Sequence, residues 1–219
     1  MSALSHMPVN DLVEQISLGT PSPGGGSVAA LCGAMAAALG GLVARLTLSK
    51  EAYEQSWKVM EQVRDQTRAL SDRFLYLMEE DTNAYLSFLE TANLPSEVPE
   101  EEEIKGILRE QMMKKAIVVP LEVLRCCKDA MPLLRSASAL GVRVAVNDAM
   151  AGLSVLRAAA VASCFTVMTN LPTLYDEEFC SSVKDEALSL MYDITSEIDG
   201  ANDQYIKALL KIQESKGWP

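Results

Sequence analysis

Two long stretches of this sequence are almost free of charge, and they constrain the fold more than any other feature. The first runs from Val28 to Leu48 with Arg45 as its only charged residue, and the second, Val142 to Met168, has three acidic or basic residues. A helix that is apolar nearly all round belongs in a protein core or in a membrane. The first run consists largely of Ala and Gly, which permit close helix packing. We therefore expect two central core helices and no membrane association, with a membrane span as the alternative.

The other helical segments are amphipathic. Apolar positions recur every three or four residues from Glu51 to about Asn93 and again from about Asp176 to Ser215. A further helix is expected to begin at Glu100–Glu103, whose negative charge suits a helix N-terminus. Pro120 predicts a kink or a short break in it before it continues to Ala139.

These segments predict an all-α fold, a bundle of long helices around two apolar central helices. A short helix should precede the loop that ends at Gly26, and Ser27 is a suitable N-cap for the first apolar helix. With 219 residues and 49% hydrophobic content, the chain can bury one substantial core. We predict a single domain over residues 8–219, with residues 1–7 as a disordered tail or an expression remnant.

Charge and composition exclude several functions. A net charge of −11 disfavours nucleic acid as a partner, because binding it needs clustered cations. The five cysteines form no CxxC pair, so we expect reduced, buried thiols in a cytoplasmic protein. The only histidine, His6, lies in the tail, which leaves acid–base chemistry to carboxylates, Lys, Tyr, Cys or water and predicts no metal site.

Three charged residues are candidates for that chemistry. Asp81 shares a helix face with large apolar residues, and Asp148 lies on a helix with almost no polar face. A carboxylate in such a place needs a partner or has a raised pKa, so each is either structurally paired, Asp148 with Arg143 or Arg157, or faces a pocket. Lys50 follows the first apolar helix, where a cation suits the helix dipole.

The loop Pro21–Ser27 combines two prolines with three glycines directly before a helix. Free backbone N–H groups at such a helix start can bind a carboxylate or a carbonyl oxygen. A plain turn between two helices is the alternative interpretation.

Several motifs together resemble the formiminotetrahydrofolate cyclodeaminase and methenyltetrahydrofolate cyclohydrolase family. They cover nearly the whole chain from about residue 8, in the order found in that family. They are Thr20-Pro-Ser-Pro-Gly-Gly-Gly-Ser-Val-Ala-Ala30, Gly33-Ala-Met-Ala-Ala-Ala-Leu39, Leu46-Thr-Leu-Ser-Lys-Glu-Ala-Tyr53, Asp81-Thr-Asn-Ala-Tyr85, Val119-Pro-Leu121, Asn147-Asp-Ala149 and Val167-Met-Thr-Asn170.

The resemblance implies an all-helical homodimer that acts on the one-carbon bridge between N5 and N10 of tetrahydrofolate, with no cofactor beyond this substrate. One reaction of the family closes 5-formiminotetrahydrofolate to 5,10-methenyltetrahydrofolate with loss of ammonia, and the other hydrolyses the methenyl compound. The resemblance implies Asp148, Asp81 and Lys50 as catalytic residues. It implies a substrate cradle of Ser22, Gly24, Gly25, Gly26, Ser27, Asn147, Thr166 and Asn170.

The sequence also departs from the family pattern. Ser49-Lys-Glu51 replaces Gly-Lys-Lys, Gly141-Val142 replaces Gly-Asn, Asn147 replaces Ser before Asp148, and Thr166 replaces Asn. An active enzyme with an altered site is the main hypothesis, and a non-catalytic folate-binding or regulatory homologue is the alternative.

Overall fold

Every regular element of the computed structural model is a helix within the residues it describes, 3–93 and 98–215. Short 3-10 turns connect several of the long helices. The helices are α1 (Val9–Ser17), α2 (Gly25–Leu48), α3 (Trp57–Ala92), α4 (Pro99–Leu140), α5 (Val146–Asn170) and α6 (Glu177–Ser215). The predicted all-α fold is confirmed.

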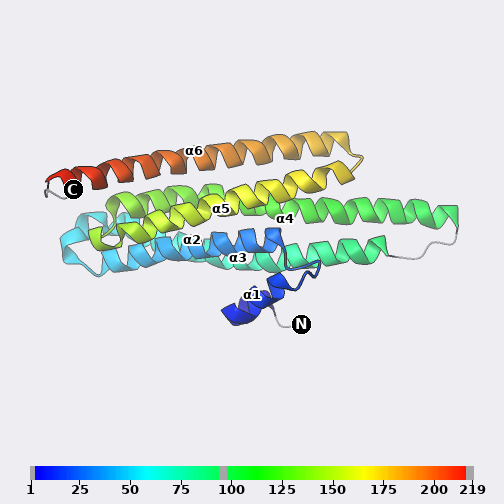
Figure 1. Ribbon diagram of the computed structural model, residues 1–219, viewed down its shortest axis with the longest axis horizontal. Coiled ribbons are helices and arrows are strands. Elements are labelled where there is room, and N and C mark those ends of the chain that lie inside the picture. Colours follow the sequence, from blue (N-terminus) through cyan, green and yellow to red (C-terminus); the bar gives the residue numbers. More distant parts are fainter. Residues whose placement is uncertain (1–2, 94–97, 216–219) are drawn as a thin grey trace.

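The two apolar helices, α2 and α5, lie side by side in the middle of the bundle (Figure 1). α2 packs on α3, α4 and α5, whereas α5 packs on α2, α4 and α6. By length and composition both could cross a membrane. Only 61% of the apolar window of α2, and 50% of the window in Arg143–Thr173, is buried. Each helix is therefore central but leaves one face exposed.

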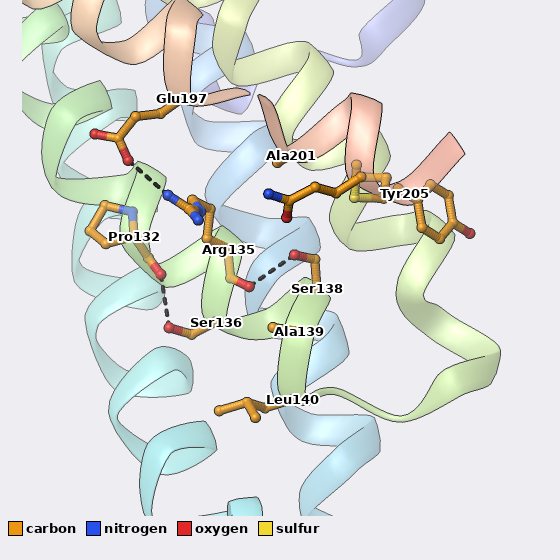
Figure 2. A pocket seen from close by; sticks show the side chains of 11 residues that line it. Pro132, Arg135, Ser136, Ser138, Ala139, Leu140, Glu197, Ala201 and Tyr205 are labelled. Atoms are coloured by element: carbon orange, nitrogen blue, oxygen red, sulfur yellow. Dashed lines mark hydrogen bonds and ion pairs between the residues drawn. The ribbon is translucent and has the colours of Figure 1, made fainter. Parts of the chain in front are cut away.

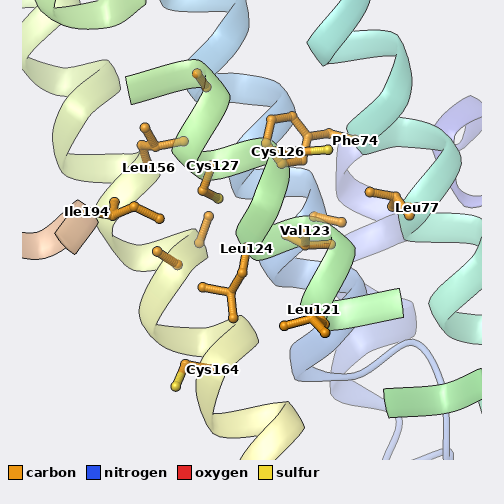
Figure 3. Packing of buried hydrophobic residues seen from close by; sticks show 14 of the residues in the cluster. Phe74, Leu77, Leu121, Val123, Leu124, Cys126, Cys127, Leu156, Cys164 and Ile194 are labelled. Carbon is orange, nitrogen blue, oxygen red and sulfur yellow. The ribbon is translucent and has the colours of Figure 1, made fainter. Parts of the chain in front are cut away.

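The main core is formed by side chains from α2 to α6 (Figure 3). Phe74 of α3 is fully buried in it and lies directly against Gly33 of α2. A Cβ atom at Gly33 would overlap the Phe74 ring. The glycine therefore sets how closely α2 and α3 can approach.

A smaller core closes the end of the bundle where α2 stops and α5 starts. The buried hydroxyl of Thr47 accepts a hydrogen bond of 2.9 Å from the Val142 N–H, and the Tyr53 hydroxyl accepts one of 3.2 Å from the Arg143 N–H. Lys50 donates its own N–H to the Thr47 carbonyl. The end of α2 and the start of α5 are thus tied together.

α6 is attached to the bundle by ion pairs as well as by apolar contacts. Arg125 of α4 makes two hydrogen bonds with Glu186, of 2.7 and 2.8 Å. Further pairs join Lys128 and Arg135 to Glu197, and Arg157 to Asp199 on α6. Arg157 is therefore occupied by α6 and is not the partner of Asp148 that the sequence left open.

Two boundaries differ from the prediction. α2 begins at Gly25, with Gly24 at its N-cap position, so Ser27 is not the cap but lies inside the first turn. α4 continues through Pro120 and Pro132 without a break, so of the kink or break expected at Pro120 only the break is excluded. Pro120 is buried, and packing of α4 along α3 and α5 outweighs the hydrogen bond that this proline removes.

The segment before α1 also differs from the prediction of a tail outside the fold. Leu4–His6 forms a 3-10 turn, Leu4 is buried in the main core, and the Ser5 N–H donates to Glu79 of α3 at 2.7 Å. Local sequence patterns did not indicate this contact, because a single buried leucine makes it. Residues 1–2 lie outside the described residues.

Candidate active site

The glycine-rich loop enters α2 against α3, and short hydrogen bonds hold it there. The Ser22 hydroxyl donates to the Thr82 hydroxyl at 2.8 Å, and the Ser27 and Thr82 hydroxyls lie 3.1 Å apart. The Ser22–Pro23 peptide bond is cis. These contacts fix the backbone of Gly24 and Gly25, neither of which has another atom near its Cβ position. The loop is therefore open to a ligand on that side.

Asp81 of α3 lies at the centre of these contacts. The Ser27 hydroxyl donates to Asp81 Oδ2 at 2.7 Å, and the Ser27 backbone N–H donates to the same carboxyl group. Burial raises the pKa of Asp81, and the two hydrogen bonds from Ser27 lower it in part. A Cβ atom at Gly26 would overlap the carboxyl group, so only glycine fits there. Asp81 thus accepts hydrogen bonds from the first turn of α2, and the pKa of its carboxyl group remains raised.

A pocket of about 430 Å³ opens beside Asp81, between the starts of α2 and the last turns of α5. This volume lies within the range of small-molecule sites. Seven residues of the predicted site line it, and two aromatic side chains, Tyr85 and Phe165, complete its wall. The predicted residues are Ser22, Gly24, Gly25, Gly26, Asp81, Thr166 and Asn170, of which Asp81 is the carboxyl group and the other six belong to the predicted cradle. Ser27 lies behind it, bonded to Asp81.

The other predicted residues lie at the opposite end of the bundle. Lys50 follows the last turn of α2, while Asn147 and Asp148 lie in the first turn of α5. Asn147 donates to Asp148 at 3.5 Å, and Lys50 is exposed. Because α2 has 24 residues, about 36 Å separates its two ends. Within one chain, the structure does not bring Lys50, Asn147 or Asp148 to the pocket.

A larger pocket, of about 610 Å³, lies between α4 and α6 but offers less chemistry (Figure 2). Its charged groups, Arg135 and Glu197, bind each other at 3.0 Å. None of the predicted site residues lines it. The pocket beside Asp81 is therefore the better candidate for an active site.

Comparison with known proteins identifies the family of the chain. A family model described as formiminotransferase-cyclodeaminase matches residues 8–189, most of the chain. The chain belongs to this family. The formimidoyltransferase-cyclodeaminase of Gallus gallus is 30% identical over 172 residues, which are 78% of this chain and 32% of that protein. The chain thus spans about a third of the length of this relative.

Two other proteins match this chain over nearly their full length. The methenyltetrahydrofolate cyclohydrolase of Methylorubrum extorquens is 26% identical over 198 residues, 90% of this chain and 92% of that protein. The crystal structure of formiminotetrahydrofolate cyclodeaminase from Thermotoga maritima aligns with a TM-score of 0.79 at 22% identity, covering 95% of this chain and 98% of that one. This structural likeness confirms the family fold.

Sequence reasoning missed Phe165 as part of the candidate site. Its side chain is 62% exposed and lines the pocket. A large aromatic residue on the exposed face of an apolar helix was the available signal. Tyr85 was recognised as part of a motif and of an apolar stripe, but not as a pocket residue.

Neither a reactive cysteine nor a metal site was found as a second candidate for an active site among the described residues. Cys126, Cys127 and Cys164 are buried, and burial raises the pKa of each thiol. Thiols with raised pKa are poor nucleophiles. Within residues 3–93 and 98–215, no group of three His, Cys, Asp or Glu side chains is placed to hold a metal ion.

Proposed function

We propose that this chain is a one-carbon folate enzyme that acts at the N5/N10 bridge of tetrahydrofolate. The reaction is either cyclodeamination of 5-formiminotetrahydrofolate or hydrolysis of 5,10-methenyltetrahydrofolate. Membership of the family supports this proposal, because its relatives carry the names of both enzymes. The observation that carries it is Asp81, a carboxyl group with a raised pKa in the wall of a pocket of suitable size.

Both reactions pass through a tetrahedral carbon between N5 and N10, and both need proton transfers at this bridge. In cyclodeamination, N10 attacks the formimino carbon and loses its proton, and the departing ammonia takes up a proton. In hydrolysis, the attacking water loses a proton, and N5 takes up a proton as the bond between N5 and the bridging carbon breaks. A carboxyl group whose pKa is raised above its ordinary value is better suited to take up and return such a proton. Asp81 is the group that performs this transfer, and Ser27 keeps it oriented through two hydrogen bonds.

The rest of the pocket suits the substrate. Tyr85 and Phe165 offer aromatic surface to a flat fused ring, and the open backbone of Gly24 and Gly25 lies at the positive end of α2. Thr166 bonds its hydroxyl to the Ala162 carbonyl, so the side chain has a fixed orientation in the wall.

The proposal also includes the location, the oligomeric state and the cofactor requirement of the enzyme. Free cysteines support a cytoplasmic location, and the exposed apolar faces of α2 and α5 support a homodimer rather than contact with a membrane. The proposed chemistry is complete with the tetrahydrofolate substrate and needs no further cofactor.

The near-ultraviolet absorbance of methenyltetrahydrofolate tests the activity. Purified protein is given either 5-formiminotetrahydrofolate or 5,10-methenyltetrahydrofolate, and Asp81→Asn is the matched control. The asparagine still accepts hydrogen bonds from Ser27 but cannot carry the proton. Appearance of the methenyl band from the first substrate identifies a cyclodeaminase, and accelerated loss of the band from the second identifies a cyclohydrolase.

The alternative, a non-catalytic folate-binding homologue, predicts a different result. Its signature is saturable binding of tetrahydrofolate with rates equal to those of Asp81→Asn on both substrates. Equal rates would refute the proposed enzyme. The changes at Ser49, Glu51, Val142, Asn147 and Thr166 would then mark a binding protein.

A further inference from the structure

A groove of about 240 Å³ lies between α2 and α3, and two arginines line it. They are Arg45 of α2 and Arg68 of α3, and the other lining residues are Ala37, Ala38, Gly41, Thr67, Ser71 and Asp72. None of these residues lines the pocket beside Asp81. Arg68 lies thirteen residues before Asp81 on α3, so about 20 Å of helix separates them. This groove, which we call the arginine groove, is therefore distinct from the candidate active site.

Neither arginine of the groove forms an ion pair within residues 3–93 and 98–215. Five other arginines of the chain do pair with carboxylates, namely Arg64, Arg73, Arg125, Arg135 and Arg157. Asp72 lines the groove but pairs with neither arginine, and the carboxylate of Asp65, whose charge acts on Arg45, is bonded to Arg64 at 2.7 Å. In a chain with a net charge of −11, two unpaired guanidinium groups on one small groove create a local region of positive potential.

Small residues of α2 keep the groove open beneath the arginines. A Cβ atom at Gly41 would lie 3.1 Å from Arg45 Nη1 and 3.1 Å from Thr67 Oγ1, so the guanidinium group lies over the glycine and beside α3. Thr67 is completely buried, and its hydroxyl donates to a backbone carbonyl of its own helix at 2.6 Å. The Ser71 hydroxyl has only a long bond of 3.5 Å to a carbonyl of α2, so it can turn towards a ligand. The groove therefore offers two guanidinium groups and one hydroxyl donor.

We propose that the arginine groove binds an anionic group, a phosphate or a carboxylate, at a site separate from Asp81. A guanidinium group presents paired N–H donors that match two oxygens of such a group. The volume of about 240 Å³ is below the roughly 300–1,000 Å³ of pockets for drug-sized ligands, which suits a small anion or the charged end of a larger molecule. Two arginines and one aspartate leave the lining with one net positive charge, which favours a singly or doubly charged group over a polyphosphate.

Two sources can supply this chemistry. One is a free anion such as inorganic phosphate, which would occupy the groove independently of any substrate. The other is the glutamate end of a tetrahydrofolate whose ring lies beside Asp81, and this source alone rests on the proposed function. The groove and its two arginines are the same in both cases, so one set of variants tests the site and a second measurement identifies the source.

Isothermal titration calorimetry at constant ionic strength tests the site. The probes are inorganic phosphate and p-aminobenzoyl-L-glutamate, each titrated into the wild-type chain. Arg45→Gln/Arg68→Gln should weaken the binding of the occupying probe by about tenfold or more, because charged hydrogen-bond donors are lost. Arg45→Lys/Arg68→Lys keeps the charge but removes the paired donors, so its affinity should lie between those of the wild type and the glutamine variant. Both arginines are exposed, and urea unfolding should show an unchanged midpoint for each variant.

The matched control is Lys58→Gln/Lys207→Gln, which removes the same charge at two exposed positions outside the groove. It should bind the occupying probe with wild-type affinity. Equal weakening in the control and in Arg45→Gln/Arg68→Gln would show an effect of net charge alone and would overturn the site. The site is also overturned if neither probe binds the wild type, or if the arginine variants bind as the wild type does.

Steady-state kinetics identifies the source and separates the groove from the proposed function. If the glutamate end of the substrate occupies the groove, Arg45→Gln/Arg68→Gln should raise KM and leave kcat nearly unchanged, because the contact is equal in the ground state and the transition state. If a free anion occupies it, phosphate should bind equally well with saturating tetrahydrofolate present, and KM should not change. Calorimetry needs no turnover, so an inactive wild type with arginine-dependent binding would refute the enzyme and keep the groove. An active wild type without such binding would refute the groove alone.

Discussion

The loss of stability caused by Ser27→Ala should depend on the ionisation of Asp81. The Ser27 side chain is completely buried, and its hydroxyl donates to Asp81 Oδ2 at 2.7 Å. A hydrogen bond to a charged group contributes about 1.5–3 kcal/mol, and one between neutral groups about 0.5–1.5 kcal/mol. The substitution should therefore cost more when Asp81 is ionised than when it is protonated.

The sign follows from the direction of the pKa shift. Burial raises the pKa of Asp81 above its value in the unfolded chain, so the contribution of this group to stability is present at low pH and is lost as the pH rises through the folded-state pKa. The Ser27 hydroxyl opposes this shift. Its removal should raise the pKa of Asp81 further, because the ionised carboxylate loses a hydrogen-bond donor.

Urea unfolding at pH values on both sides of the Asp81 titration measures this effect. The cost of Ser27→Ala should increase with pH in the wild-type background. In an Asp81→Asn background it should be small and independent of pH, because the double-mutant cycle removes the charged partner. The pH–rate profile should shift upwards with the same substitution. A cost that is equal at all pH values and in both backgrounds would show that Ser27 does not act through the Asp81 carboxylate.

Two further substitutions test other contacts. Gly26→Ala should lower the free energy of unfolding by about 1–3 kcal/mol in urea and reduce turnover, because the added Cβ overlaps Asp81. Gly25→Ala has open space at its Cβ and should leave the stability unchanged or slightly higher. Equal losses of stability in the two variants would contradict this packing. Arg125→Ala should cost up to about 1 kcal/mol at low salt and less in about 1 M NaCl, because its pair with Glu186 is partly exposed; a cost that ignores salt would argue for lost packing instead.

The helices could be predicted from the sequence because their signals are local. The two nearly uncharged runs predicted α2 and α5, and the loop before Ser27 predicted the break between α1 and α2. The buried stripe that includes Asp81 predicted a carboxyl group with a partner or a raised pKa, and the structure shows both. The N-cap was predicted at the wrong residue because the Ser27 hydroxyl bonds to another helix, which no local pattern reveals.

The position of the candidate site depended on contacts between distant segments. The motifs placed Lys50 and Asp148 in one site with Asp81, although the length of α2 alone separates its two ends by about 36 Å. Applying the helical rise to the predicted helix would have shown this separation. The pairing of Arg157 with Asp199, by contrast, required knowing where α6 lies on the bundle.

The bond between Ser27 and Asp81 has a consequence for how sequences of this family evolve. Asp81 accepts hydrogen bonds from the first turn of α2, so natural selection for a folded chain retains it even where selection for turnover has ceased. A descendant that lost its activity would keep the aspartate, the serine and the glycine between them and the loop. The presence of these residues in a related sequence would therefore indicate common ancestry and a common fold.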